Sequence, residues 1–209
     1  MSKSRARSQT GNSGFSLVEV MVAIFVLTVG VVAVAALAGT MMTTGNRSKY
    51  MSLEASLASE KLEDLNHWAA NQPQVCVPTG DASVGSLTSD VLQTTTCPLG
   101  ATASIAYYDD VNINFSNAST DCVSSLGGCF DETVAAGGAQ YTTTYHSPDG
   151  TVTTATTATA PTNMTFHRRW IIEANSPVAG VRRITVLVKV TNSDISPFNP
   201  TFQMSLVRP

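Results

Sequence analysis

An uninterrupted apolar segment near the N-terminus places the strongest constraint on this chain. Residues 15–38 read FSLVEVMVAIFVLTVGVVAVAALA, and Glu19 is the single charged residue among them. At about 1.5 Å a residue this segment forms about 36 Å of helix, which is enough to cross a bilayer. The residues before it include three basic side chains and no acid, and the next basic residue after it is Arg47. The positive-inside rule therefore predicts a cytoplasmic N-terminus and an exported remainder.

Two common kinds of N-terminal segment explain this pattern less well. A secretory signal peptide has an apolar core of about 7–15 residues that ends at a small-residue cleavage site. Here the core is longer, and its small residues at 33–39 lie deep inside it. A plain signal anchor explains the length but not Glu19, because a charge in an apolar span costs a few kcal/mol unless it has a partner or lies near the interface. An acid that only reaches the interface remains the alternative for Glu19.

Residues 13–20, SGFSLVEV, resemble the processing signature of type IV prepilins. In that family a membrane aspartic protease cuts after the glycine and then N-methylates the new first residue. The resemblance implies cleavage between Gly14 and Phe15, N-methylation of Phe15, and Glu19 as the fifth residue of the mature chain. At that place Glu19 can neutralise the terminal amine of a neighbouring subunit in the filament, and such a pairing is strong in low dielectric.

The part of the chain that is predicted to be exported is acidic. All 15 acidic residues follow residue 14, with 9 of the 12 basic ones, so this part has a formal charge of −6. From Glu63 to His167 there are 10 acidic residues and no Lys or Arg. Such a field keeps an exported domain soluble and disfavours a nucleic-acid partner.

The four cysteines all lie downstream of the apolar segment. They are Cys76, Cys97, Cys122 and Cys129, with 20, 24 and 6 residues between neighbours. This is not the paired spacing of a zinc site, so we expect no metal. An even number in an exported region predicts two disulfides. Three pairings are possible; we favour Cys76–Cys97 with Cys122–Cys129, which closes short loops, and the sequence leaves the other two open.

The helical pattern continues after the apolar segment. Residues 47–70 place apolar side chains at spacings of three and four, with Glu60 and Lys61 among the polar residues expected on the exposed side. Gly39–Gly45 marks a place for a bend or local melting, and Pro73 ends the helix. We therefore expect a cleaved leader at 1–14, a transmembrane and filament-core helix at 15–38, an amphipathic docking helix at 39–73 and a β-rich periplasmic or extracellular head at 74–209.

The head is predicted to be β-rich, so the fold class is α+β: a long helical spine packed on an antiparallel sheet with disulfide-pinned loops. Residues 170–174 and 184–190 alternate in polarity around a turn at 175–180. A further strand is expected at 202–206. Residues 141–145 and 151–157 are predicted to pair as a hairpin. Residues 76–130 are less regular, and we expect loops there.

No enzymatic site is predicted. The three histidines, His67, His146 and His167, are scattered, and the sequence has no nucleophile elbow, phosphate loop or metalloprotease motif. We therefore expect no catalytic residue and no cofactor. The acids Asp109 and Asp110 are interpreted as a solvated loop rather than a calcium site, because the EF-hand pattern is missing.

The one basic cluster outside the leader is interpreted as a charged strand edge that discourages aggregation. It consists of Arg168, Arg169, Arg182 and Arg183. A contact with a neighbouring acidic head or with DNA is the alternative.

The chain beyond the signature indicates the kind of pilin. Ala36 stands where major pilins commonly carry a proline, and the last 80 residues lack the cysteine-bounded loop of major pilins. Residues 55–65, ASLASEKLEDL, are similar to the helix of PilV-type minor pilins and of type II secretion pseudopilin I. The resemblance implies a minor subunit that helps to initiate a type IV pilus or joins its tip, in motility or adhesion. A type II secretion pseudopilin, a DNA-uptake minor pilin and a stand-alone anchored protein remain alternatives.

The same resemblance implies the partners and the location. The partners are prepilin peptidase/methyltransferase, major and minor pilins, and the inner-membrane assembly platform. The chain is expected to cross the inner membrane once with a periplasmic head, and then to reach the pilus at the cell surface.

Overall fold

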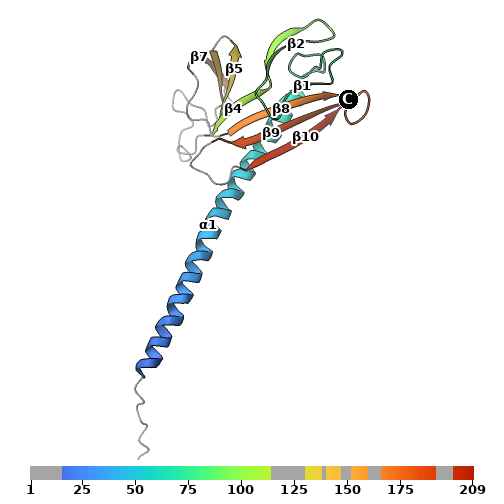
Figure 1. The fold of residues 1–209 in the computed structure, drawn as a ribbon. Coiled ribbons are helices and arrows are strands. Elements are labelled where there is room, and N and C mark those ends of the chain that lie inside the picture. Colours follow the sequence, from blue (N-terminus) through green and yellow to red (C-terminus); the bar gives the residue numbers. More distant parts are fainter. Residues whose placement is uncertain (1–15, 114–129, 138–139, 147–151, 160–165, 192–199) are drawn as a thin grey trace, which may run out of the picture. The chain divides into compact units, whose positions relative to one another are not determined.

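The computed structural model describes residues 16–113, 130–137, 140–146, 152–159, 166–191 and 200–209. The architecture is one long N-terminal helix and an antiparallel β-sheet, as predicted (Figure 1). The chain divides into two compact units, Met1–Asn46 and Arg47–Pro209.

One helix and ten strands are present in the described part of the chain. The helix α1 is Leu17–His67. The strands are β1 (Ser83–Gly85), β2 (Leu92–Thr96), β3 (Thr102–Ala106), β4 (Tyr108–Ile113), β5 (Phe130–Gly137), β6 (Gln140–His146), β7 (Val152–Thr157), β8 (Phe166–Ala174), β9 (Arg182–Val190) and β10 (Thr201–Arg208).

In the first unit, every described residue of α1 is exposed. The helix is long and apolar enough to cross a membrane, by length and composition. The local melting that the sequence allows at Gly39–Gly45 does not occur, since α1 runs through this stretch without interruption. A glycine costs only about 1 kcal/mol in a helix interior, and two of them do not break a helix of this length.

In the second unit, α1 presents one buried face to the sheet. The buried residues recur at spacings of three and four: Glu54, Leu57, Ala58, Lys61, Leu62 and Leu65. Two charged side chains therefore lie on the apolar face, and the prediction that Lys61 is on the exposed side is wrong. The two are seven residues apart, which places them on the same side of a helix.

The helix ends at His67, before the expected end near Pro73. The Arg208 guanidinium of β10 donates through Nη1 to the carbonyls of Asn66 and Trp68, at 3.1 and 2.9 Å. These carbonyls would otherwise lack partners at the helix end. A contact from a distant strand thus stabilises an earlier end than the local sequence predicts.

The large sheet belongs to the second unit and has the strand order β10-β9-β8-β4-β5-β6-β7 (Figure 1). All its pairings are antiparallel, and β2 and β3 form a separate two-stranded sheet. Two predicted hairpins are confirmed: β8 pairs with β9, and β6 pairs with β7. The predicted C-terminal strand is β10, which pairs with β9.

The prediction of irregular loops over 76–130 is wrong in part, because β1 to β4 fall within it. Strands β1 and β4 both pair with β8, at 171–173 and 166–169 respectively. Gly85 lies at their junction with a φ of 79°. A Cβ there would lie 2.3 Å from the Trp170 carbonyl oxygen and 2.9 Å from the Tyr107 side chain. Only glycine fits this junction without movement.

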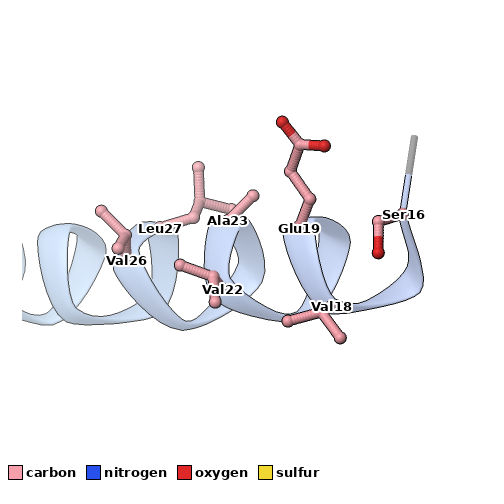
Figure 2. A pocket seen from close by; sticks show the side chains of 7 residues that line it. All are labelled: Ser16, Val18, Glu19, Val22, Ala23, Val26 and Leu27. Carbon is pink, nitrogen blue, oxygen red and sulfur yellow. The ribbon is translucent and has the colours of Figure 1, made fainter. Parts of the chain in front are cut away.

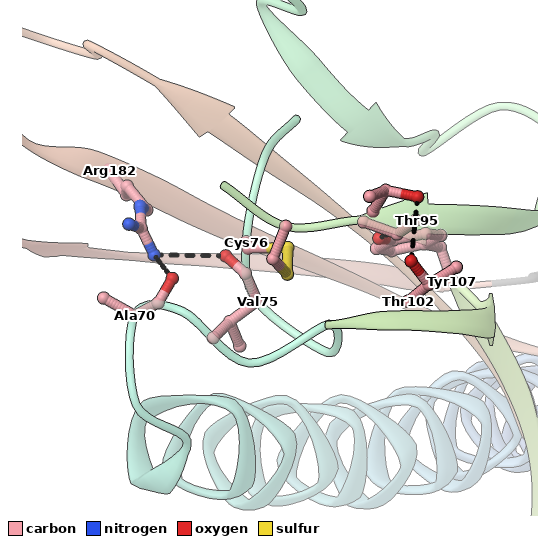
Figure 3. Close-up of a disulfide and its surroundings, with 9 residues drawn as sticks. Ala70, Val75, Cys76, Thr95, Thr102, Tyr107 and Arg182 are labelled. Atoms are coloured by element: carbon pink, nitrogen blue, oxygen red, sulfur yellow. Dashed lines mark hydrogen bonds between the residues drawn. A yellow bond between two sulfur atoms is a disulfide. The ribbon is translucent and has the colours of Figure 1, made fainter. Parts of the chain in front are cut away.

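A disulfide joins Cys76 to Cys97, with the two Cα atoms 5.9 Å apart (Figure 3). This bond is the first of the two in the favoured pairing, and Cys122 and Cys129 lie outside the described residues. Beside it, Arg182 Nη1 donates to the carbonyl of Ala70 at 2.7 Å.

The hydrophobic core lies between α1 and the sheet. Its strand residues include Phe166, Trp170 and Ile172 on β8 and Ile184, Val186, Val188 and Val190 on β9. These are alternate positions along each strand, and together they form the apolar face that the sequence predicts.

Candidate functional site

The first candidate site is the N-terminal end of α1. Glu19 lies in its first turn, where a negative charge complements the helix dipole. Figure 2 shows its carboxylate projecting away from the helix, beside Val22, Ala23 and Leu27. Gly14 and Phe15, the predicted cleavage and methylation site, lie outside the described residues.

The surroundings of Glu19 are apolar and exposed. Val18 is 66% exposed and Val22 56% exposed, and the open surface around the carboxylate is lined almost wholly by aliphatic side chains. No hydrogen bond or ion pair joins the Glu19 carboxylate to any residue that the structure describes. Chemically, the arrangement presents one anion on an apolar helix surface, and this anion can accept a cation from another chain.

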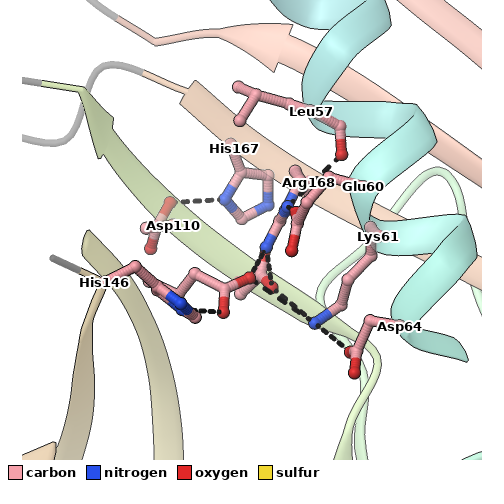
Figure 4. Close-up of polar contacts among 10 residues, drawn as sticks. Leu57, Glu60, Lys61, Asp64, Asp110, His146, His167 and Arg168 are labelled. Atoms are coloured by element: carbon pink, nitrogen blue, oxygen red, sulfur yellow. Dashed lines mark hydrogen bonds and ion pairs between the residues drawn. The ribbon is translucent and has the colours of Figure 1, made fainter. Parts of the chain in front are cut away.

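The second candidate site is a buried ion-pair cluster in the second unit, centred on Arg168 of β8 (Figure 4). Arg168 is fully buried. Its Nε and Nη2 donate to the two carboxylate oxygens of Asp109 on β4, each at 2.7 Å. Its Nη1 donates to Glu60 of α1 at 2.5 Å, and its Nη2 also donates to Glu132 of β5. One guanidinium therefore joins three strands and the helix.

Lys61 of α1 adds a second buried cation. Its Nζ lies 3.1 Å from Asp109 Oδ2 and 3.4 Å from Asp64, and 4.7 Å from the ring centre of Trp170. Burial disfavours the charge on Asp109, but Arg168 and Lys61 outweigh this and lower the pKa of Asp109 to about 2. Burial likewise disfavours the charge on Lys61, but Asp109, with Glu132 and Asp64, outweighs burial and the repulsion of Arg168, so the pKa of Lys61 is raised.

This cluster corrects two predictions. Asp109 is not in a solvated loop, since it lies fully buried in β4. The four arginines do not form a charged edge, because β8 is an interior strand of the sheet. Arg183 pairs with Glu173 at 2.6 Å, and Arg169 donates to Asp90 at 2.7 Å. Three of the four arginines therefore have separate acidic partners, and Arg182 donates to backbone carbonyls.

A signal for the buried arginine was present in the sequence. Along β8 the buried positions are Phe166, Arg168, Trp170 and Ile172. Arg168 has the same parity as the three apolar residues, and alternation along a strand puts such residues on one face. The charge of the adjacent pair Arg168-Arg169 predicts an exposed position for both residues, whereas the alternation along the strand predicts that Arg168 is buried.

The histidines do not form a common site. His67 ends α1, His146 lies 3.0 Å from Glu132, and His167 contacts Asp110 and Asp90. Within the described ranges, no group of three His, Cys, Asp or Glu side chains is arranged to hold a metal ion.

Comparison with known proteins bears on the first site alone. Residues 10–35 match the family described as the prokaryotic N-terminal methylation motif. No curated protein and no solved structure matches the chain. The matched segment contains Gly14, Phe15 and Glu19, so the comparison supports a type IV prepilin-like protein that is processed at its N-terminus.

Proposed function

We propose that this chain is a minor subunit of a type IV pilus, of the PilV type, that takes part in initiation or at the tip. In this proposal prepilin peptidase removes residues 1–14 and methylates Phe15. Residues 15–38 then pack in the filament core, residues 39–73 dock on the head, and residues 74–209 form the head. The chain works by assembly with other pilins and the inner-membrane platform, and no catalytic chemistry is required of it.

The observation that carries the proposal is the exposed Glu19 carboxylate on an apolar helix, within the matched methylation motif. In a membrane or a filament core an unpaired carboxylate is costly. A methylated amine at Phe15 of a neighbouring subunit would supply the missing cation. Correctly staggered neighbours are then favoured over misplaced ones, because only they bring the two charges together.

The buried ion-pair cluster supports the proposed role of the second half of α1. Residues 55–65, which resemble PilV-type pilins and pseudopilin I, contribute Glu60 and Lys61 to the cluster. Buried pairs of this kind need particular geometry, and we propose that they hold the helix in one register on the sheet.

The processing step is tested by mass spectrometry of the protein from its native membrane. The expected chain begins at methylated Phe15. Replacing Gly14→Val should leave the leader attached, because a side chain there obstructs entry of an extended backbone into the protease. An unmethylated wild-type chain that begins at Met1 or Ser2 would contradict the proposal.

The assembly role is tested with Glu19→Ala and the matched control Glu63→Ala, since Glu63 is an exposed acid farther along α1. We expect Glu19→Ala to be processed and inserted but absent from sheared fibres, and Glu63→Ala to assemble normally. Equal incorporation of both variants would refute the electrostatic account.

Gene deletion separates the alternatives. Loss of surface pili is expected for a pilus subunit. Loss of exoprotein secretion with pili intact would instead indicate a type II secretion pseudopilin, and loss of DNA uptake alone a competence pilin. A strain with none of these defects would indicate a stand-alone anchored protein.

A further inference from the structure

The second unit contains a histidine whose two ring nitrogens both face carboxylates. His167 lies on β8 opposite Asp110 of β4 in the strand register. Its Nδ1 is 2.6 Å from Asp110 Oδ1, and its Nε2 is 2.8 Å from Asp90 Oδ1. The His167 side chain is only 13% exposed.

This geometry calls for a protonated ring. A neutral imidazole has one N–H, so it can donate to one carboxylate only, and its other nitrogen would present a lone pair to the second carboxylate. The imidazolium donates to both, and such charge-assisted hydrogen bonds are the stronger kind. Both contacts can therefore be favourable only while His167 carries its proton.

The charged neighbours favour that proton. Burial disfavours the charged ring, but the hydrogen bonds and charges of Asp110 and Asp90 outweigh burial and raise the pKa of His167. Among the described residues, the other ionisable groups near it are Arg169, which donates to Asp90, Tyr108, whose ring centre is 5.9 Å away, and exposed Lys189 opposite His167 on β9.

Asp90 belongs to the connection between β1 and β2, residues 86–91. The near end of this loop continues from β1, and the far end is held by the Val91 carbonyl, which accepts from the backbone N–H of Tyr107 at 2.8 Å. The serine and threonine hydroxyls of the loop bond within it. Within the described part of the chain, the side-chain hydrogen bonds from this loop to the large sheet are those of Asp90 to His167 and Arg169.

We propose that His167 is a pH-sensitive latch, which holds the 86–91 loop against β8 through Asp90 while protonated and loosens it when the proton is lost. On deprotonation Nδ1 keeps its hydrogen and its bond to Asp110, since β4 holds that carboxylate in register. Nε2 then becomes an acceptor that faces the Asp90 carboxylate. Among the described residues, the Arg169 Nε bond alone then continues to hold Asp90 to the sheet.

The direction with pH follows from the raised pKa. The latch is fully closed below the ordinary histidine pKa of about 6.5, and it opens as the pH rises through the higher value in the folded protein. This inference concerns the second unit alone and does not rest on the proposed role in a pilus. It adds a response to the surrounding pH in that unit.

The test is hydrogen–deuterium exchange of the full-length protein in detergent, from about pH 5 to about pH 9, with each rate divided by its intrinsic value. In the wild-type protein, protection of amides in 86–91 should fall on the order of tenfold with rising pH, the scale expected for losing one charge-assisted hydrogen bond. Protection in β9 follows the stability of the whole unit and should exceed that of the loop at every pH, which reports that the sheet remains folded. A pH-independent wild-type loop would overturn the proposal.

Three variants identify the group responsible. His167→Gln should leave the loop weakly protected at every pH. Asp110→Asn should move the transition to lower pH, because the imidazolium loses one of its two carboxylates. The matched control His67→Gln alters the histidine at the end of α1 and should reproduce the wild-type transition. If His167→Gln retained that transition, another group would be the titrating one and the latch would be disproved.

Discussion

Glu54 is an ionisable side chain in the apolar core between α1 and the sheet. It is fully buried on the core face of α1, and neither carboxyl oxygen has a hydrogen-bond partner within the described residues. Burial raises the pKa of Glu54 to about 7. At neutral pH the side chain is therefore held between its neutral and charged forms.

This raised pKa makes stability depend on pH. Between the unfolded value near 4.5 and about 7, the unfolded chain releases a proton that the folded chain retains, so the free energy of unfolding falls as pH rises. The loss reaches up to about 3 kcal/mol and is complete above pH 7. Glu54→Gln should remove this part of the dependence of the free energy of unfolding on pH. Urea unfolding at several pH values measures that dependence.

The control for that measurement is Glu63→Gln, an exposed acid on the same helix. Its stability curve should run parallel to that of the wild-type protein. Comparing slopes instead of absolute stabilities removes the cost of burying an amide. If the Glu54→Gln curve also ran parallel, the carboxyl would have an ordinary pKa in the folded state.

At the scale of elements, the junction of β1, β4 and β8 depends on one glycine. Gly85 has a left-handed backbone, and a Cβ there would overlap the Trp170 carbonyl. Gly80 also has a positive φ, of 101°, but nothing lies near its Cβ position. Both glycines therefore have a positive φ, but only Gly85 has neighbouring atoms close to its Cβ position.

We expect Gly85→Ala to lower the free energy of unfolding by about 2–4 kcal/mol, as backbone strain of about 1 kcal/mol adds to overpacking of about 1–3 kcal/mol. Gly80→Ala should cost only the strain, about 1 kcal/mol. Urea denaturation of both variants checks the difference. Equal losses would mean that the β1–β8 junction accommodates the added methyl group with no further loss of stability.

At the scale of the whole second unit, the Arg168 cluster joins elements far apart in the sequence. Glu60 on α1 and Arg168 on β8 are separated by 108 residues, and Asp109 and Arg168 by 59. The net contribution of a buried ion pair to stability is small, but removing one partner leaves an uncompensated charge. The cluster is thus better suited to specifying an arrangement than to adding stability.

Arg168→Met should destabilise the unit by about 3–5 kcal/mol, because Asp109 is left buried with Lys61 as its remaining cation. The matched variant Arg169→Met removes a surface pair with Asp90 and should cost less than about 1 kcal/mol. Thermal unfolding of both variants checks this. Similar losses would show that Arg168 contributes packing alone.

The predictions that succeeded rest on local periodicity. The long apolar helix, its amphipathic continuation, the β8–β9 and β6–β7 hairpins and the strand β10 all follow from patterns within short windows of sequence. The local cysteine pairing was one choice among three, and its first bond is present. The sequence does not predict the strands β1 to β4, because they are short and because β1 and β4 pair with successive parts of the same strand, β8.

By itself the sequence determined the long apolar helix, its lone acid and the β-rich composition of the second unit, because each is a property of neighbouring residues. Only the tertiary structure decided which charged side chains are buried and which groups they pair with. Whether Lys61, Asp109 and Arg168 face water or one another depends on which elements meet, and so does the contact of His167 with two carboxylates. The energy of a charge depends on its dielectric surroundings and partners, and distant parts of the chain supply both.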